Sequence, residues 1–186
     1  VPHTATYYVM PDYLAIGSDA DFVRFPMEPR TAQAIGDAFG CILPTRKMVN
    51  DIWSAAPYKL APHPYSPTAY DIESVEVFSL SNTSIESQRT AAGAPLGGLI
   101  AGTKKDVVIS AQLAVRPGKV VIYGWHQLNG RAIQPLYLGH DINYMDYSHG
   151  IRLVRQIMLV DGQPCHVQDV LKDPNLCQLL SDEGVI

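Results

Sequence analysis

Residues 120–155 gather the side chains of this chain that are best suited to proton transfer. An imidazole titrates near neutral pH, so a histidine can act as a general base or acid when a nearby carboxylate orients it. Asp146 stands three residues before His149, and Asp141 adjoins His140. We therefore predict an acid–base site in this stretch. Its candidate catalytic residues are His126, His140, Asp146, Ser148 and His149.

The same histidines suit two other roles. Neutral imidazole nitrogens with a carboxylate are a ligand set that zinc accepts, so a zinc-dependent enzyme is the second hypothesis. The spacing matches no established ligand motif such as HExxH. Histidines at strand ends can also bond locally and carry out no chemistry. In that case the chain is a non-catalytic binding module of the cell envelope, which is the third hypothesis.

The run Ser148-His149-Gly150-Ile151-Arg152 resembles the serine–histidine–glycine–cysteine–arginine signature of the L,D-transpeptidases, which remodel peptidoglycan with a cysteine nucleophile. A further histidine lies upstream in that family, and His126 stands roughly in its place. The nucleophilic cysteine of the family follows the glycine, where this chain has Ile151. The resemblance is confined to this short stretch and assigns no catalytic role.

Cys41 is the candidate nucleophile if catalysis is covalent. A reactive thiol needs a base nearby, and the start of a helix helps to lower its pKa. Cys41 lies a few residues before a helix expected at 45–56, so the Leu43-Pro44 link would have to fold back. The alternative is a buried thiol that packs as a small apolar side chain.

Cationic and aromatic side chains around the histidines are candidates for binding substrate. Arg152, Lys104 and Lys105 can hold a negative charge, and arginine does so with two parallel hydrogen bonds. Trp125 and Tyr147 can stack on a sugar or a peptide, although aromatic residues on a sheet also pack in cores. We expect an exported hydrolase that acts on a cell-wall peptide or glycan.

The elements that must position these residues form an α+β pattern. Apolar spacing predicts helices over 29–39, 45–56 and 67–89, with Thr45 as an N-cap. From Leu99 onward, short extended runs alternate with turn residues. Asn129-Gly130 predicts a hairpin that pairs Val120–Gln127 with Arg131–Leu138 and places Gln127 opposite Ala132. We expect a single domain over 1–186: helices over about 29–92 packed on a mainly antiparallel sheet over about 97–160, then short helices at 165–180.

Composition limits the partners and the compartment. The formal net charge of −4 gives no basic footprint for nucleic acid, and no apolar run is long enough to span a membrane. The chain opens Val1-Pro2-His3 without methionine, which favours a secreted or periplasmic protein with its leader removed. Cys165 and Cys177 can pair in such a compartment. The oligomeric state is left open.

Overall fold

The computed structural model describes residues 2–186 and has a mixed α+β fold. The helices are α1 (Pro29–Ala38), α2 (Arg46–Ala55), α3 (Val75–Ala91) and α4 (Val167–Lys172), with short 3₁₀ turns η1 (Ala111–Ala114) and η2 (Cys177–Leu179). The strands are β1 (Ala5–Thr6), β2 (Ala15–Ser18), β3 (Asp21–Arg24), β4 (Cys41–Ile42), β5 (Tyr58–Lys59), β6 (Ile100–Ala101), β7 (Lys105–Val107), β8 (Ile122–His126), β9 (Ala132–Tyr137), β10 (His149–Gly150), β11 (Val154–Arg155), β12 (Ile157–Val160) and β13 (Gln163–His166). Short strands thus also occur among the helices of the first half.

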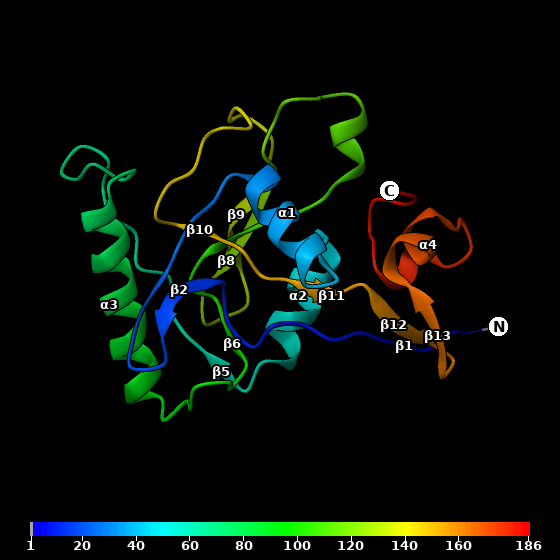
Figure 1. The fold of residues 1–186 in the computed structure, drawn as a ribbon, viewed down its shortest axis with the longest axis horizontal. Coiled ribbons are helices and arrows are strands. Elements are labelled where there is room, and N and C mark those ends of the chain that lie inside the picture. The colour runs from blue at the N-terminus through cyan, green and yellow to red at the C-terminus, as the bar shows by residue number, and fades with distance from the viewer. Residues whose placement is uncertain (1) are drawn as a thin grey trace.

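The sheet that carries the candidate residues has the strand order β10-β7-β8-β9. β7, β8 and β9 pair antiparallel, whereas β10 pairs parallel to β7 and places His149 opposite Lys105. Strands β1, β12 and β13 form a separate antiparallel sheet. Figure 1 shows α3 along one side of the molecule and β12, β13 and α4 at the opposite side, where both termini lie.

Helix α2 begins where the sequence predicts. The Thr45 hydroxyl accepts a hydrogen bond from the amide of Met48, which satisfies one of the free N–H groups at a helix start. The same hydroxyl donates to the carbonyl of Leu180, so it also ties the C-terminal segment to this end of α2.

Helix α3 begins later than the prediction, which placed its start at Pro67. The amides of Ala69 and Tyr70 both bond to the carbonyl of Ser66, so this segment forms turns. The helix starts after Ser74, whose hydroxyl accepts from the amide of Val77. Ser66 and Ser74 each precede an apolar residue and could each cap a helix. Only Ser74 does so.

The predicted hairpin exists as β8–β9, but its register differs by one residue. His126 pairs with Ala132, where the prediction paired Gln127 with Ala132. The turn is closed by a bond from the amide of Gly130 to the carbonyl of Gln127, and the amide of Gln127 bonds to the carbonyl of Arg131. Gln127 therefore belongs to the turn.

The apolar side chains of the two halves pack against each other in several clusters. Val49 of α2 packs with Val108 and Val121, while Ala32 of α1 packs in a cluster with Val107. Val107 and Val108 are adjacent on one extended segment, and adjacent residues point to opposite sides. Helices α1 and α2 therefore meet side chains from opposite sides of this segment.

All three cysteines are free thiols. Cys165 lies on β13, where it pairs with Met158, and Cys177 lies in η2. The pairing of Cys165 with Cys177 that the sequence allows is absent from the structure.

Candidate functional site

The Asp146 carboxylate organises the turn that precedes β10. Its Oδ1 accepts bonds from the amide of Ser148, at 2.7 Å, and from the Ser148 hydroxyl, while Oδ2 accepts from the Tyr144 hydroxyl at 3.1 Å. Burial acts to raise the pKa of Asp146, but His149, Lys105 and the Ser148 donors outweigh it and hold the pKa below its ordinary value. Asp146 is therefore a buried, charged carboxylate that accepts hydrogen bonds from several donors.

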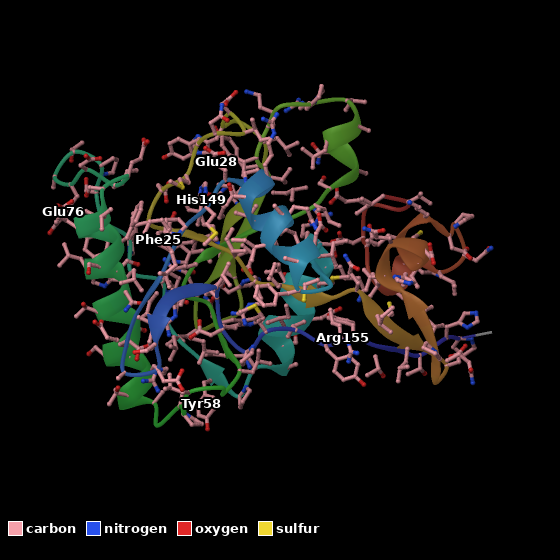
Figure 2. All side chains as sticks on the ribbon, viewed as in Figure 1. Phe25, Glu28, Tyr58, Glu76, His149 and Arg155 are labelled. Atoms are coloured by element: carbon pink, nitrogen blue, oxygen red, sulfur yellow. The ribbon has the colours of Figure 1, made fainter. Side chains whose placement is uncertain are left out.

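His149, which is labelled in Figure 2, is 0 % exposed and stands near this carboxylate. Its Nε2 lies 3.9 Å from Oδ2 of Asp146, too far for a hydrogen bond. Within residues 2–186 neither ring nitrogen has a hydrogen-bond partner. Burial lowers the pKa of His149 well below its usual range, and Asp146 opposes this only in part. The ring is therefore neutral at pH 7.

His140 and Tyr144 flank the buried ring. Their own rings stack with centroids 3.9 Å apart, and the Tyr144 ring lies 5.6 Å from that of His149. The centroids of His140 and His149 are 6.3 Å apart. His140 and Tyr144 are each half-buried, whereas the His149 ring is fully buried. The structure thus brings together His140, Asp146, Ser148 and His149 of the predicted set.

Tyr144 was not among the predicted site residues. Its hydroxyl bonds to Asp146, and burial together with the charge of that carboxylate raises the pKa of Tyr144. The sequence signal for this pair is its short spacing: Tyr144 stands two residues before Asp146, so its phenol can bond to that carboxylate within one turn.

Lys105 joins the cluster from the neighbouring strand. It is the register partner of His149, and partners across a ladder project to the same face. Its ammonium lies 5.1 Å from the centroid of the Trp125 ring and donates no hydrogen bond within residues 2–186. Burial lowers the pKa of Lys105, which Asp146 partly offsets.

The two aromatic residues expected to stack on a substrate are core residues in the structure. Trp125 and Tyr147 are buried and pack with Val77 and Phe78 of α3. The Trp125 indole donates to the carbonyl of Thr103 at 2.9 Å. Their rings hold the sheet against α3, and little of either ring is exposed to a ligand in solution.

Lys104 and Arg152 were also expected to face substrate, and each is 1 % exposed. The Lys104 ammonium donates to the carbonyl of Tyr147 at 2.5 Å, and its pKa is lowered to about 7, chiefly by burial. Arg152 donates to the carbonyls of Met10 and Ile100, both at 2.9 Å. Both cations are thus engaged with backbone carbonyls inside the protein.

Asp106 and Tyr13 complete a polar group around Arg152. The Tyr13 hydroxyl donates to Asp106 at 3.1 Å, and the Arg152 guanidinium lies 4.3 Å from the centroid of the Tyr13 ring. Burial raises the pKa of Asp106 to about 6, against the opposing effect of Arg152. Gly150 lets this group approach the strand, because a Cβ there would lie 2.5 Å from the Tyr13 ring.

His126 lies apart from His149. Its ring stacks on Trp53 of α2 at 5.2 Å, and its Nε2 lies 3.1 Å from Oδ1 of Asn50. Gly124 and Trp125 have φ angles of 109° and 55°, and the register of β8 shifts at this point. This irregularity interrupts the alternation of side chains and leaves His126 facing α2.

Cys41 lies on β4, paired with Arg155 of β11. Its thiol donates to the carbonyl of Phe39 at 3.5 Å, and burial raises its pKa although Arg155 opposes the shift. A raised pKa keeps the sulfur protonated, and the reactive form of a catalytic cysteine is the thiolate. Its surroundings therefore do not activate Cys41 as a nucleophile.

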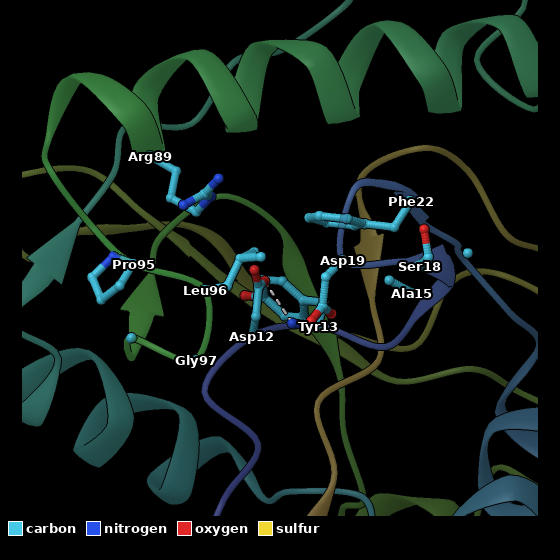
Figure 3. Close-up of a pocket in the computed structure, with 12 residues that line it drawn as sticks. Asp12, Tyr13, Ala15, Ser18, Asp19, Phe22, Arg89, Pro95, Leu96 and Gly97 are labelled. Carbon is cyan, nitrogen blue, oxygen red and sulfur yellow. Dashed lines mark hydrogen bonds between the residues drawn. The ribbon is translucent and has the colours of Figure 1, made fainter.

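A cavity of about 240 Å³ lies beside Tyr13 (Figure 3). Figure 3 shows Arg89 projecting from α3, with Phe22 and Asp19 contributed by the β2–β3 hairpin region. Asp12 in its wall binds the buried Arg24, and Arg89 binds Glu86. Asp12 and Arg89 in this wall are thus already paired with other side chains of the protein.

The arrangement of ligand-forming side chains and the character of the helices bear on metals and membranes. Across residues 2–186, no set of three or more His, Cys, Asp or Glu side chains is arranged to hold a metal ion. In the same residues, none of the helices has the length and apolar character needed to cross a membrane. Comparison with known protein families, curated proteins and solved structures found no match to this chain.

Proposed function

We propose that the chain is a hydrolase whose proton-transfer site is the group formed by His140, Tyr144, Asp146 and His149. The observation that carries this proposal is a neutral, buried imidazole with both nitrogens unbonded, 3.9 Å from a charged carboxylate. Histidines that serve only structure usually bond to a neighbour, as His126 does with Asn50. Buried titratable groups with shifted pKa values next to a specific charge concentrate at functional sites.

The geometry supports His149 as the base. The ring is neutral at pH 7, so one nitrogen has a lone pair free to accept a proton from an attacking water or hydroxyl. Asp146 then stabilises the imidazolium through its charge, because its oxygens already accept bonds from Ser148 and Tyr144. These donors fix the carboxylate while the proton moves. Half-buried His140 lies on the solvent side and can pass the proton to water.

The substrate class in this proposal is a cell-wall peptide or glycan, encountered outside the cytoplasm. Support comes from the Ser148-His149-Gly150 run, which resembles that of a family acting on peptidoglycan, and from the expected export. Because Trp125 and Tyr147 are buried, they are not part of the substrate surface in this proposal. Tyr144 and His140, which stack on each other and are half-buried, are the rings of the group that remain partly exposed.

The experiment follows the release of soluble fragments from purified peptidoglycan by chromatography. His149→Gln should lower the rate by at least about a hundredfold, the usual contribution of a general base. Tyr144→Phe, which removes one donor to Asp146, should lower it less. His166→Gln is the matched control, since His166 is exposed on β13 in the C-terminal sheet. Circular dichroism confirms that each variant is folded.

Two results would count against the proposal. One is full activity in a folded His149→Gln variant. The other is the absence of turnover on peptidoglycan, peptides and glycans together with retained binding of one of them in that variant, which would make the chain a binding module.

A further inference from the structure

Two neighbouring groups of this site have unused hydrogen-bond donors. A neutral imidazole carries one N–H, and neither nitrogen of His149 is bonded within residues 2–186. The Lys105 ammonium carries three N–H groups and lies over the Trp125 ring, with no hydrogen bond to the described residues. Because Lys105 is the register partner of His149, both side chains project to the same face.

An unbonded donor in a buried setting costs free energy, so the His149 ring favours an acceptor supplied from outside, and the partly buried Lys105 adds its donors on the same face. Asp146 does not serve as that acceptor for His149, since the two are 3.9 Å apart and its oxygens bind Ser148 and Tyr144. An ammonium and an imidazole N–H side by side are donors that favour an anionic oxygen, where hydrogen bonds are strongest.

We propose that Lys105 and His149 together bind a carboxylate of the substrate, such as the C-terminal carboxylate of a peptide. This inference rests on the proposed function for the identity of the bound molecule as a substrate. One ring nitrogen of His149 donates to the carboxylate, and the other remains free to accept a proton. The carboxylate thereby places the scissile group beside the base.

Charge balance favours a carboxylate over a phosphate. The Lys105 ammonium donates no hydrogen bond to the described residues, whereas Lys104 is bonded to the Tyr147 carbonyl. A single negative charge is matched by Lys105. A phosphate near pH 7 carries up to two charges and would place the second near the Asp146 carboxylate.

The test uses the full chain and three small probes, and it needs no turnover. The probes are N-acetylglycine, which carries the carboxylate, N-acetylglycinamide, which has the same shape without the charge, and inorganic phosphate. Ring resonances of His149 are followed by NMR as each probe is added. N-acetylglycine should shift them in a saturable manner, and N-acetylglycinamide should not. Equal binding of the amide, tighter binding of phosphate, or no saturable shift with N-acetylglycine would overturn the proposal.

The variants locate the binding group. Lys105→Met should weaken N-acetylglycine binding by about tenfold or more, because a charge-assisted hydrogen bond is lost. Lys59→Met is the matched control: the Lys59 ammonium lies 5.4 Å from the centroid of the Trp53 ring, outside this cluster. Lys105→Arg keeps the charge, so its affinity for N-acetylglycine should be within a few-fold of that of the parent. This variant still tests the assignment if the methionine variant does not fold. Unchanged binding in Lys105→Met, or its loss in Lys59→Met, contradicts the assignment.

The two proposals fail in different ways. Saturable carboxylate binding that needs Lys105, without hydrolysis of any substrate tested, leaves the anion site standing and removes the hydrolase. Hydrolysis that needs His149, without any binding of N-acetylglycine, leaves the hydrolase standing and removes the anion site.

Discussion

Nε2 of His149 and Oδ2 of Asp146 lie 3.9 Å apart, and both side chains are buried. At this separation the pair interacts through charge and forms no hydrogen bond. A small movement of the turn that carries Asp146 would therefore change the proton affinity of the ring. Catalytic contacts are often this long before a substrate is bound and shorten afterwards.

Acidification should destabilise the protein through His149. The pKa of its ring is lowered in the folded state by burial, so between the ordinary value near 6.5 and the lower folded value the unfolded chain binds more protons. Stability from this group is complete above pH 6.5 and is lost as the pH falls toward the folded pKa. Urea unfolding at a series of pH values measures this slope. His149→Gln should be flatter over the same range, and an unchanged slope would contradict the burial effect.

Asp106 should act in the opposite direction. Its pKa is raised from 3.8 to about 6, so the folded state holds the proton more tightly than the unfolded state. Its contribution to stability is fully present below pH 3.8 and is lost as the pH rises through about 6. Asp106→Asn removes this dependence. Between pH 4 and pH 7 the stability of the variant relative to the parent should rise by roughly 3 kcal/mol at most. A difference that is constant with pH would show that Asp106 ionises normally.

Arg24 should be far more costly to replace than Arg46. It is 1 % exposed, and its guanidinium bonds to the carboxylates of Asp12 and Glu86 and to Asn82. Arg24→Met leaves the Asp12 carboxylate without its cation, while Glu86 keeps Arg89, and should cost roughly 3–5 kcal/mol in chemical denaturation. Arg46→Met breaks the partly exposed pair with Asp182 and should cost less than about 1 kcal/mol. Equal costs would contradict this ranking.

Gly150→Ala tests the close packing between β10 and Tyr13. An added Cβ would lie 2.5 Å from the Tyr13 ring and 2.9 Å from Cβ of Lys104, so the tyrosine must move away from Asp106. We expect a loss of roughly 1–3 kcal/mol, the usual cost of overpacking, measured by urea unfolding. The same change in a Tyr13→Ala background should cost clearly less, because the obstructing ring is gone. Additive losses would indicate another cause.

Local patterns predicted the elements better than the contacts between them. The Thr45 cap and the apolar face of 45–56 predict α2, and Asn129-Gly130 predicts the β8–β9 hairpin. The α+β class follows from the same patterns and is confirmed. The predicted start of α3 at Pro67 was wrong because Ser66 and Ser74 offer similar capping signals, and only Ser74 caps the helix.

The candidate site was predictable only where its residues are close in sequence. His140, Asp146, Ser148 and His149 share one turn and its approach, so their proximity follows from spacing. His126 was grouped with them because it lies in the same stretch of sequence, but the irregularity at Gly124 and Trp125 turns it toward α2. Lys104 and Arg152 are buried because they bond to the carbonyls of Tyr147, Met10 and Ile100. These carbonyls are distant in sequence, so the sequence pattern alone could not predict the contacts.

The bond from the Thr45 hydroxyl to the carbonyl of Leu180 has a practical consequence for anyone who handles this protein. The last residues of the chain are fastened to the body at the same point where α2 starts, and Ser110 and Arg46 add bonds to Glu183 and Asp182. A bulky label near Glu183 would load these bonds, and a label near His3 would load another set, because the His3 ring and the Thr4 amide bond to the Asp161 carboxylate. A label therefore belongs on an exposed segment away from both, such as residues 115–118.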